Sequence, residues 1–160
     1  MRIPELDIRT VIALLVLGNL TVIFVLLIYD LRTLKETATR SFLLGKLLQA
    51  LAWSLLWLRG MIPNPWSINV GNSLLLAGFG LECLGLASAE GGEPRWRPAF
   101  GAATILGVLA FNLASGSNPN IRVAVVSIAT IGPYGLLAAA MLSEGRGSSL
   151  RLGIAGCDIA

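Results

Sequence analysis

The sequence contains no histidine among its 160 residues. Histidine is the most common general base and metal ligand, and it is the side chain that titrates near neutral pH, so its absence excludes the usual forms of these sites. The two cysteines, Cys83 and Cys157, match no zinc or redox spacing and cannot define a disulfide framework. P-loop, GxSxG, HExxH and Rossmann glycine patterns are also missing. The sequence therefore predicts no catalytic residues, no metal, no cofactor and no enzyme activity.

Charge is scarce as well. Charged residues make up 13% of the chain and hydrophobic residues 55%, whereas about a quarter of an average soluble domain is charged. The 12 Lys and Arg against 9 Asp and Glu leave a net charge of +3, a surplus too small to indicate nucleic-acid binding. With a mean hydropathy of +0.76, the composition predicts an integral membrane protein whose main partner is the lipid bilayer.

The apolar runs predict an all-α, polytopic helical membrane bundle. A helix needs about 20 apolar residues to cross a hydrocarbon core about 30 Å thick. Runs of this kind predict five spans, at about residues 9–29, 42–59, 69–89, 98–114 and 122–142. The short connections make neighbouring helices antiparallel, and Pro133 is expected to kink or loosen the fifth span. Residues 1–148 form one transmembrane domain, and residues 149–160 form a short tail or an incomplete sixth span.

The distribution of basic residues predicts the orientation of the bundle. One set of loops and the C-terminal tail carry eight of them: Arg32, Lys35, Arg40, Lys46, Arg95, Arg97, Arg146 and Arg151. The opposite side carries four: Arg2, Arg9, Arg59 and Arg122. Because cytoplasmic loops are enriched in Lys and Arg, we expect the N-terminus outside the cell and the C-terminus in the cytoplasm.

Glu82 stands out because an acidic side chain within a membrane span is costly and usually has a partner. Lys46 lies at a similar depth on the preceding span, so the sequence predicts that the two side chains pair. The alternative is that Lys46 reaches the headgroups along its flexible stem while Glu82 is protonated or faces another helix. We therefore treat these two residues, with Asn72 and Asn112, as a candidate intramembrane polar site.

The uncharged polar residues of the spans have a structural interpretation as well. Asn19, Gln49, Asn72 and Asn112 are each favoured to form hydrogen bonds between helices rather than to line a cavity. Small residues at Ala99, Ala103 and Gly107 recur every four positions and predict a close-packing face. This face lies either within the bundle or between copies of the chain, and in the second case it would be the contact of a homo-oligomer.

Three segments carry a resemblance to a known family. They are residues 51–60 (LAWSLLWLRG) before a proline-containing turn, residues 71–78 (GNSLLLAG) followed by Glu82, and residues 120–124 (NIRVA) followed by Ser127. In order and spacing, residues 7–142 resemble the N-terminal multi-span sensor region of bacterial membrane-bound diguanylate cyclases. The segment EGGEP at residues 90–94 is not the GGDEF motif of that family, because it fills a short loop between spans.

The resemblance implies a sensory input module of the bacterial inner membrane, without catalytic output. In that family a further span leads into the catalytic domain, whereas this chain ends at Ala160, which is also what a truncated product would show. A stimulus would act by shifting the population of helix arrangements. Two alternatives remain: a small oligomeric transporter or channel subunit that uses Glu82, and an accessory membrane protein that binds a partner.

Overall fold

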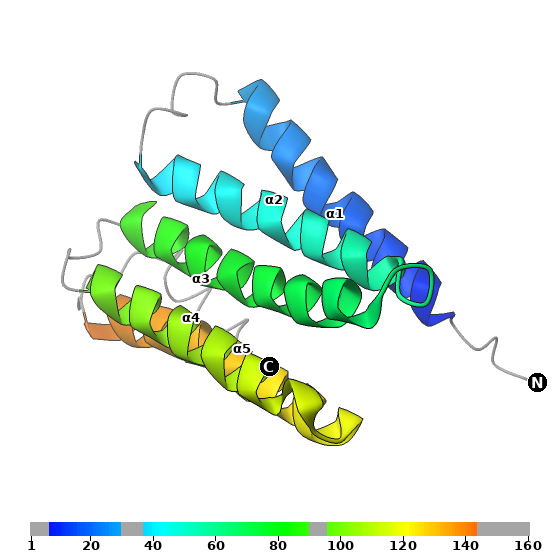
Figure 1. Ribbon diagram of the computed structural model, residues 1–160. Helices are drawn as coiled ribbons and strands as arrows, with labels where there is room; N and C mark the ends of the chain where they lie inside the picture. The colour runs from blue at the N-terminus through cyan, green and yellow to red at the C-terminus, as the bar shows by residue number, and fades with distance from the viewer. Residues whose placement is uncertain (1–6, 30–36, 90–95, 144–160) are drawn as a thin grey trace, which may run out of the picture.

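The computed structural model describes residues 7–29, 37–89 and 96–143 (Figure 1). Within these ranges the chain is helical and contains no strand, which confirms the all-α prediction. The long helices are α1 (Ile8–Tyr29), α2 (Thr37–Trp57), α3 (Gly71–Ala89), α4 (Trp96–Leu113) and α5 (Pro119–Ser143). A π-helical segment, η2 (Pro65–Val70), leads directly into α3, and a short 3₁₀ turn, η3 (Ala114–Gly116), follows α4.

Four of these helices are long and apolar enough to cross a membrane: Ile8–Ile28, Pro65–Ala89, Trp96–Gly116 and Pro119–Leu142. Four of the five predicted spans are among these helices, and the second, at residues 42–59, is not. The helix exists there as α2, but Arg40, Lys46 and Gln49 reduce its hydropathy, so composition alone does not mark it as a span. The predicted incomplete sixth span, at residues 149–160, lies outside the described residues.

The boundaries differ from the predicted ones mainly at helix starts. Residues 65–68, expected in a loop, are helical and extend the third span back to Pro65. Helix α5 begins at Pro119 rather than at Arg122. Proline is well tolerated in the first turn of a helix, because its missing N–H has no partner there in any case. Further along, α5 continues through Pro133 as one helix.

The helices form a sequential arrangement with α3 in the middle (Figure 1). Helix α1 packs on α2, α2 packs along α3, and α3 contacts both α4 and α5. The outer and central helices differ in burial. Only 6% of the α1 span is buried inside the protein, whereas 44% of the span that contains α3 is buried. A core cluster from α3, α4 and α5 consists of Cys83, Ala87, Phe100, Leu137 and Met141. Helix α3 is therefore the element through which the rest of the bundle is connected.

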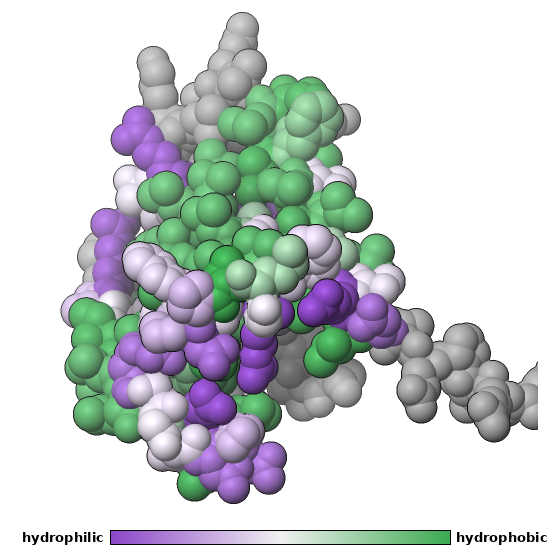
Figure 2. Space-filling model, turned by 45° about the vertical axis from the view of Figure 1, so that its right-hand side comes forward, coloured by the Kyte–Doolittle hydropathy of each residue, from purple (hydrophilic) through white to green (hydrophobic). Residues whose placement is uncertain are grey.

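Much of the outer surface is apolar. Figure 2 shows apolar side chains spread over a large part of one face, with hydrophilic ones gathered among them. Large exposed hydrophobic residues include Phe24 at 63%, Ile105 at 61% and Ile128 at 69%, from α1, α4 and α5. Exposing such a surface to water is unfavourable, whereas lipid chains are as apolar as these side chains. The exposed surface therefore agrees with the hydropathy of the four candidate spans.

Glycines bring the backbones of α2 and α3 into direct contact. A Cβ atom added at Gly45 would lie 2.8 Å from both the backbone nitrogen of Glu82 and the carbonyl oxygen of Gly78. A Cβ atom at Gly85 would lie 2.7 Å from the backbone nitrogen of Phe42. Small residues of this kind permit close helix packing in membranes. We call Gly45, Gly78 and Gly85 the α2–α3 glycines.

The predicted small-residue face of α4 contacts α5 within the same chain. A Cβ atom added at Gly107 would lie 3.0 Å from the Cβ of Ala129, and one added at Gly132 would lie 3.9 Å from the Cβ of Ala103. Ala103 and Gly107 are therefore used inside the bundle. Ala99, the third member of the stripe, is half-buried.

Candidate functional site

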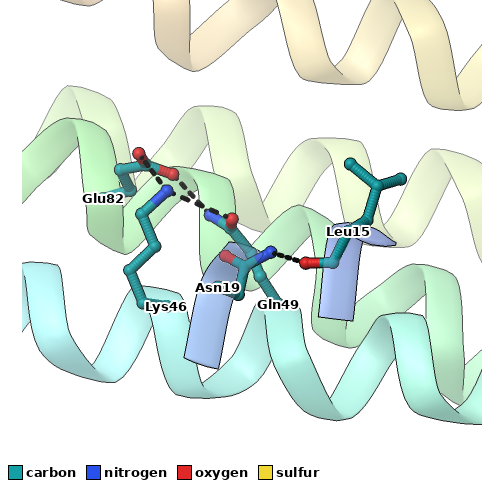
Figure 3. A network of polar contacts seen from close by, with 5 residues as sticks. All are labelled: Leu15, Asn19, Lys46, Gln49 and Glu82. Carbon is teal, nitrogen blue, oxygen red and sulfur yellow. Dashed lines mark hydrogen bonds and ion pairs between the residues drawn. The ribbon is translucent and has the colours of Figure 1, made fainter. Parts of the chain in front are cut away.

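Lys46 and Glu82 meet between α2 and α3, and Figure 3 shows their side chains pointing toward one another. The Nζ atom of Lys46 lies 2.6 Å from the Oε1 atom of Glu82, and the two side chains are only 15% and 12% exposed. Because α2 and α3 run antiparallel (Figure 1), residues at matching depth on the two helices come together. The predicted pairing is confirmed, and the alternative, a separately placed lysine and acid, is not observed.

Gln49 completes this group of polar side chains. Its Nε2 atom donates a hydrogen bond of 2.5 Å to the Oε2 atom of Glu82, so both carboxylate oxygens have a partner. Lys46 also donates to the Oε1 atom of Gln49 at 3.5 Å. We call these three residues the Lys46–Gln49–Glu82 cluster (Figure 3). Charges buried away from water need such complete pairing, because an unpaired polar group in a low-dielectric region is costly.

The sequence interpretation assigned Gln49 only to hydrogen bonding between helices and left it out of the candidate site. The hydrogen bond between α2 and α3 is present, so that assignment was correct. A signal for its place in the site did exist, because Gln49 follows Lys46 by three residues and such residues share one helix face. Gln49 is 3% exposed, which places it deeper in the helix interface than its polarity alone indicates.

The surroundings of Lys46 further stabilise its charge. The Nζ atom lies 5.4 Å from the ring centroid of Phe42, one turn earlier on α2. A cation over an aromatic face gains electrostatic attraction from the ring. Phe42 also lies against Gly85, so the α2–α3 glycines and the polar cluster occupy the same contact between the two helices.

Asn72 and Asn112 do not join the cluster. Asn72 donates to the carbonyl oxygen of Ile68 at 2.7 Å, within its own helical segment. It precedes Glu82 by ten residues, which is about 15 Å along a helix. Asn112 donates to the hydroxyl oxygen of Ser73 at 3.0 Å and so connects α4 with α3. The grouping of these two asparagines with Glu82 was wrong, because their depth along the helices differs. The structural interpretation holds for Asn112.

Asn19 has a different role from the one expected. Its side-chain nitrogen donates to the carbonyl oxygen of Leu15 at 2.8 Å, one turn earlier on α1 (Figure 3). Thr21 and Ser54 also bond to their own helices, each through a carbonyl oxygen four residues earlier. These side chains satisfy their own donors locally instead of joining helices.

The chemistry available to the cluster is that of a compensated ion pair. Within the described ranges, no group of three or more His, Cys, Asp or Glu side chains is arranged to hold a metal. The cluster contains an ammonium, a carboxylate and an amide, and none of these has an activated nucleophile beside it. Such a group can hold two helices in one register, and it loses its bonds if that register changes.

Comparison of the chain with protein-family models, with curated proteins and with solved structures found no match.

Proposed function

We propose that this chain is a membrane sensory module with no catalytic activity of its own, similar in role to the input regions of bacterial diguanylate cyclases. The observation that supports this most is the buried Lys46–Gln49–Glu82 cluster at the contact between α2 and α3. Polar groups buried at a helix contact favour one alignment over others, which is the property that a two-state element requires.

In the proposed mechanism, the bonds of the cluster form at only one alignment of α2 along α3. A helix rises 1.5 Å per residue, so a slide of α2 along α3 by one residue would separate the 2.6 Å ion pair. In a low-dielectric interior the lost attraction is large, and intermediate positions are disfavoured. Because α3 also packs on α4 and α5, a change in the α2–α3 register would be passed on to α5.

In this proposal α2 crosses the bilayer together with the four apolar helices, and the protein lies in the bacterial inner membrane. Lys46 and Glu82 compensate each other's charge, which reduces the free-energy cost of placing these side chains in the hydrocarbon region. Composition alone does not register this compensation and therefore does not mark α2 as a span. The basic-residue distribution supports an N-terminus outside the cell and a C-terminus in the cytoplasm.

The orientation predicts the accessibility of the connection between α4 and α5. Ser117 is exposed between η3 and α5. In a variant without Cys83 and Cys157, a Ser117→Cys substitution should react with a membrane-impermeant maleimide added to intact spheroplasts. Reaction only after the membrane is opened would contradict the orientation.

A fusion protein tests the sensory role. Residues 1–143 would be joined to the catalytic domain of a diguanylate cyclase, and cyclic dinucleotide would be measured in cells that make none otherwise. Lys46→Met and Glu82→Gln should each change the product level several-fold, because about 1 kcal/mol shifts a two-state ratio about fivefold. Ser54→Ala is the matched control on α2, because the Ser54 hydroxyl donates to the carbonyl oxygen of Ala50 within its own helix.

The proposal fails if all fusions give equal product at equal membrane levels. The unfused chain should make no cyclic dinucleotide at all. If liposomes containing the chain instead conduct ions, and Glu82→Gln abolishes the flux, the transporter or channel alternative replaces the sensory role.

A further inference from the structure

A cavity of about 240 Å³ lies at the end of the bundle opposite to the Lys46–Gln49–Glu82 cluster. It is bounded by the end of α2 and by Arg59 shortly after it, by η2 and the start of α3, by the end of α4, and by the start of α5. Its lining includes Arg59, Asn72, Arg122 and Ser127, together with the apolar side chains of Leu56 and Phe111. Since Asn72 precedes Glu82 by about 15 Å along the helix, the cavity is separate from the cluster.

Two positive charges from distant parts of the sequence converge on this cavity. Arg59 follows α2 and is exposed, while Arg122 lies in the first turn of α5 and is half-buried. Within residues 7–29, 37–89 and 96–143, no acidic side chain lines the cavity. In Figure 2, in which this end of the bundle comes forward, hydrophilic side chains gather among the apolar ones.

The chemistry of the lining indicates the kind of ligand. A guanidinium group has five N–H donors and no acceptor, and it binds carboxylate or phosphate with two parallel hydrogen bonds. Asn72 uses its amide nitrogen on Ile68, while the hydroxyl of Ser127 adds another polar group to the lining. Leu56 and Phe111 supply an apolar wall. A cavity of about 150 Å³ is sufficient for benzene, so this one has room for an anionic group with a short apolar portion.

We propose that the Arg59–Arg122 cavity binds an anionic amphiphile through its phosphate or carboxylate group. Two sources share this chemistry: the headgroup of an anionic lipid, and a small soluble acid with an apolar tail. This binding proposal is independent of the sensory role, because ligand binding is measured directly and does not require that the chain transmit a signal.

The test measures the thermal unfolding midpoint of the purified full chain in a non-ionic detergent, at constant ionic strength. Dioleoyl phosphatidylglycerol, hexanoate and inorganic phosphate are the anionic probes. Phosphatidylcholine and hexanol are the matched probes without net charge. A ligand that binds the folded state raises the midpoint in a saturable manner. We expect this from at least one anionic probe. Phosphatidylglycerol alone would identify a lipid headgroup, hexanoate would identify a soluble amphiphilic acid, and a response to inorganic phosphate would show that the charged group suffices.

Substitutions then locate the site. Arg59→Gln and Arg122→Gln should each raise the apparent Kd about tenfold, because each removes a charge-assisted hydrogen bond. Arg9→Gln is the matched control: Arg9 lies in the first turn of α1 at the same end of the bundle but outside the cavity lining (Figure 1). Arg59 is exposed and outside the helices, so its variant should unfold at the normal temperature without ligand.

Two results would overturn the proposal. One is the absence of any saturable shift beyond those of phosphatidylcholine and hexanol. The other is a loss of affinity in Arg9→Gln equal to that in the cavity variants, which would show that anions bind the basic end of the bundle without a defined site.

Discussion

Replacing Lys46 with methionine is expected to lower the free energy of unfolding in detergent micelles by about 3 kcal/mol. The substitution keeps the apolar stem of the side chain but removes the ammonium group that lies 2.6 Å from Glu82. The carboxylate then keeps only the hydrogen bond from Gln49. A buried charge without its partner is the main cause of the loss, since the pair itself is close to neutral once desolvation is included.

A double-mutant cycle separates the pair from its members. Glu82→Gln should also destabilise the protein, because it leaves the ammonium of Lys46 without its carboxylate. The double variant Lys46→Met, Glu82→Gln should lose less free energy of unfolding than the two single variants added together. The difference should be about 1–3 kcal/mol, which is within the range observed for residues in direct contact. Ser54→Ala provides the baseline for a polar substitution on α2. Additive effects of the two single substitutions would show that the ion pair contributes nothing to stability.

Replacing Gly45 with alanine is expected to destabilise the protein by about 1–3 kcal/mol, the usual cost of overpacking. The added Cβ would lie 2.8 Å from two backbone atoms of α3, and neither can move away by a side-chain rotation. The helices must therefore separate or slide, and the adjacent Lys46 moves with α2. We expect the variant to weaken the Lys46–Glu82 pair as well, so that the coupling measured by the cycle decreases in a Gly45→Ala background.

Gly101 of α4 is the matched control for this substitution. A Cβ atom there would meet nothing within 4 Å, so Gly101→Ala should be neutral or stabilising by up to about 1 kcal/mol because of its helix propensity. Both variants would be measured by the same unfolding assay in micelles. If Gly45→Ala proves as stable as Gly101→Ala, the close approach of α2 and α3 is not a requirement of the fold.

Several features could be predicted from the sequence because they depend on distance along a helix. Uncharged runs of suitable length located α1, α3, α4 and α5, since only a helix satisfies every backbone group of a short segment in lipid. The Lys46–Glu82 pair could be predicted for the same reason, because matching depth on antiparallel neighbours follows from residue counts. Hydropathy does not mark α2 as a span, because an average over a window cannot register that a charge is neutralised by a partner on another helix.

The direction in which most of the polar side chains point around their helices was not predicted from the sequence. Gln49 faces Glu82, whereas Asn72 bonds within its own segment and Asn112 reaches Ser73. The sequence predicted hydrogen bonds between helices for all three residues, but it grouped the two asparagines with Glu82 and left Gln49 out. The two arginines of the cavity were counted for orientation, and nothing in their spacing placed Arg59 beside Arg122.

The sequence by itself determined that this is an all-α protein, that α1, α3, α4 and α5 are apolar enough to cross a membrane, and where along the helices its charged residues lie. Tertiary structure alone decided how each helix is rotated, that Gly45, Gly78 and Gly85 join α2 to α3, and that two arginines share a cavity. The physical reason is that apolar side chains identify the buried face of a helix only when the opposite face is exposed to water. Between apolar helices in lipid, packing and a few polar contacts select the interface, and these emerge only when the helices are placed together.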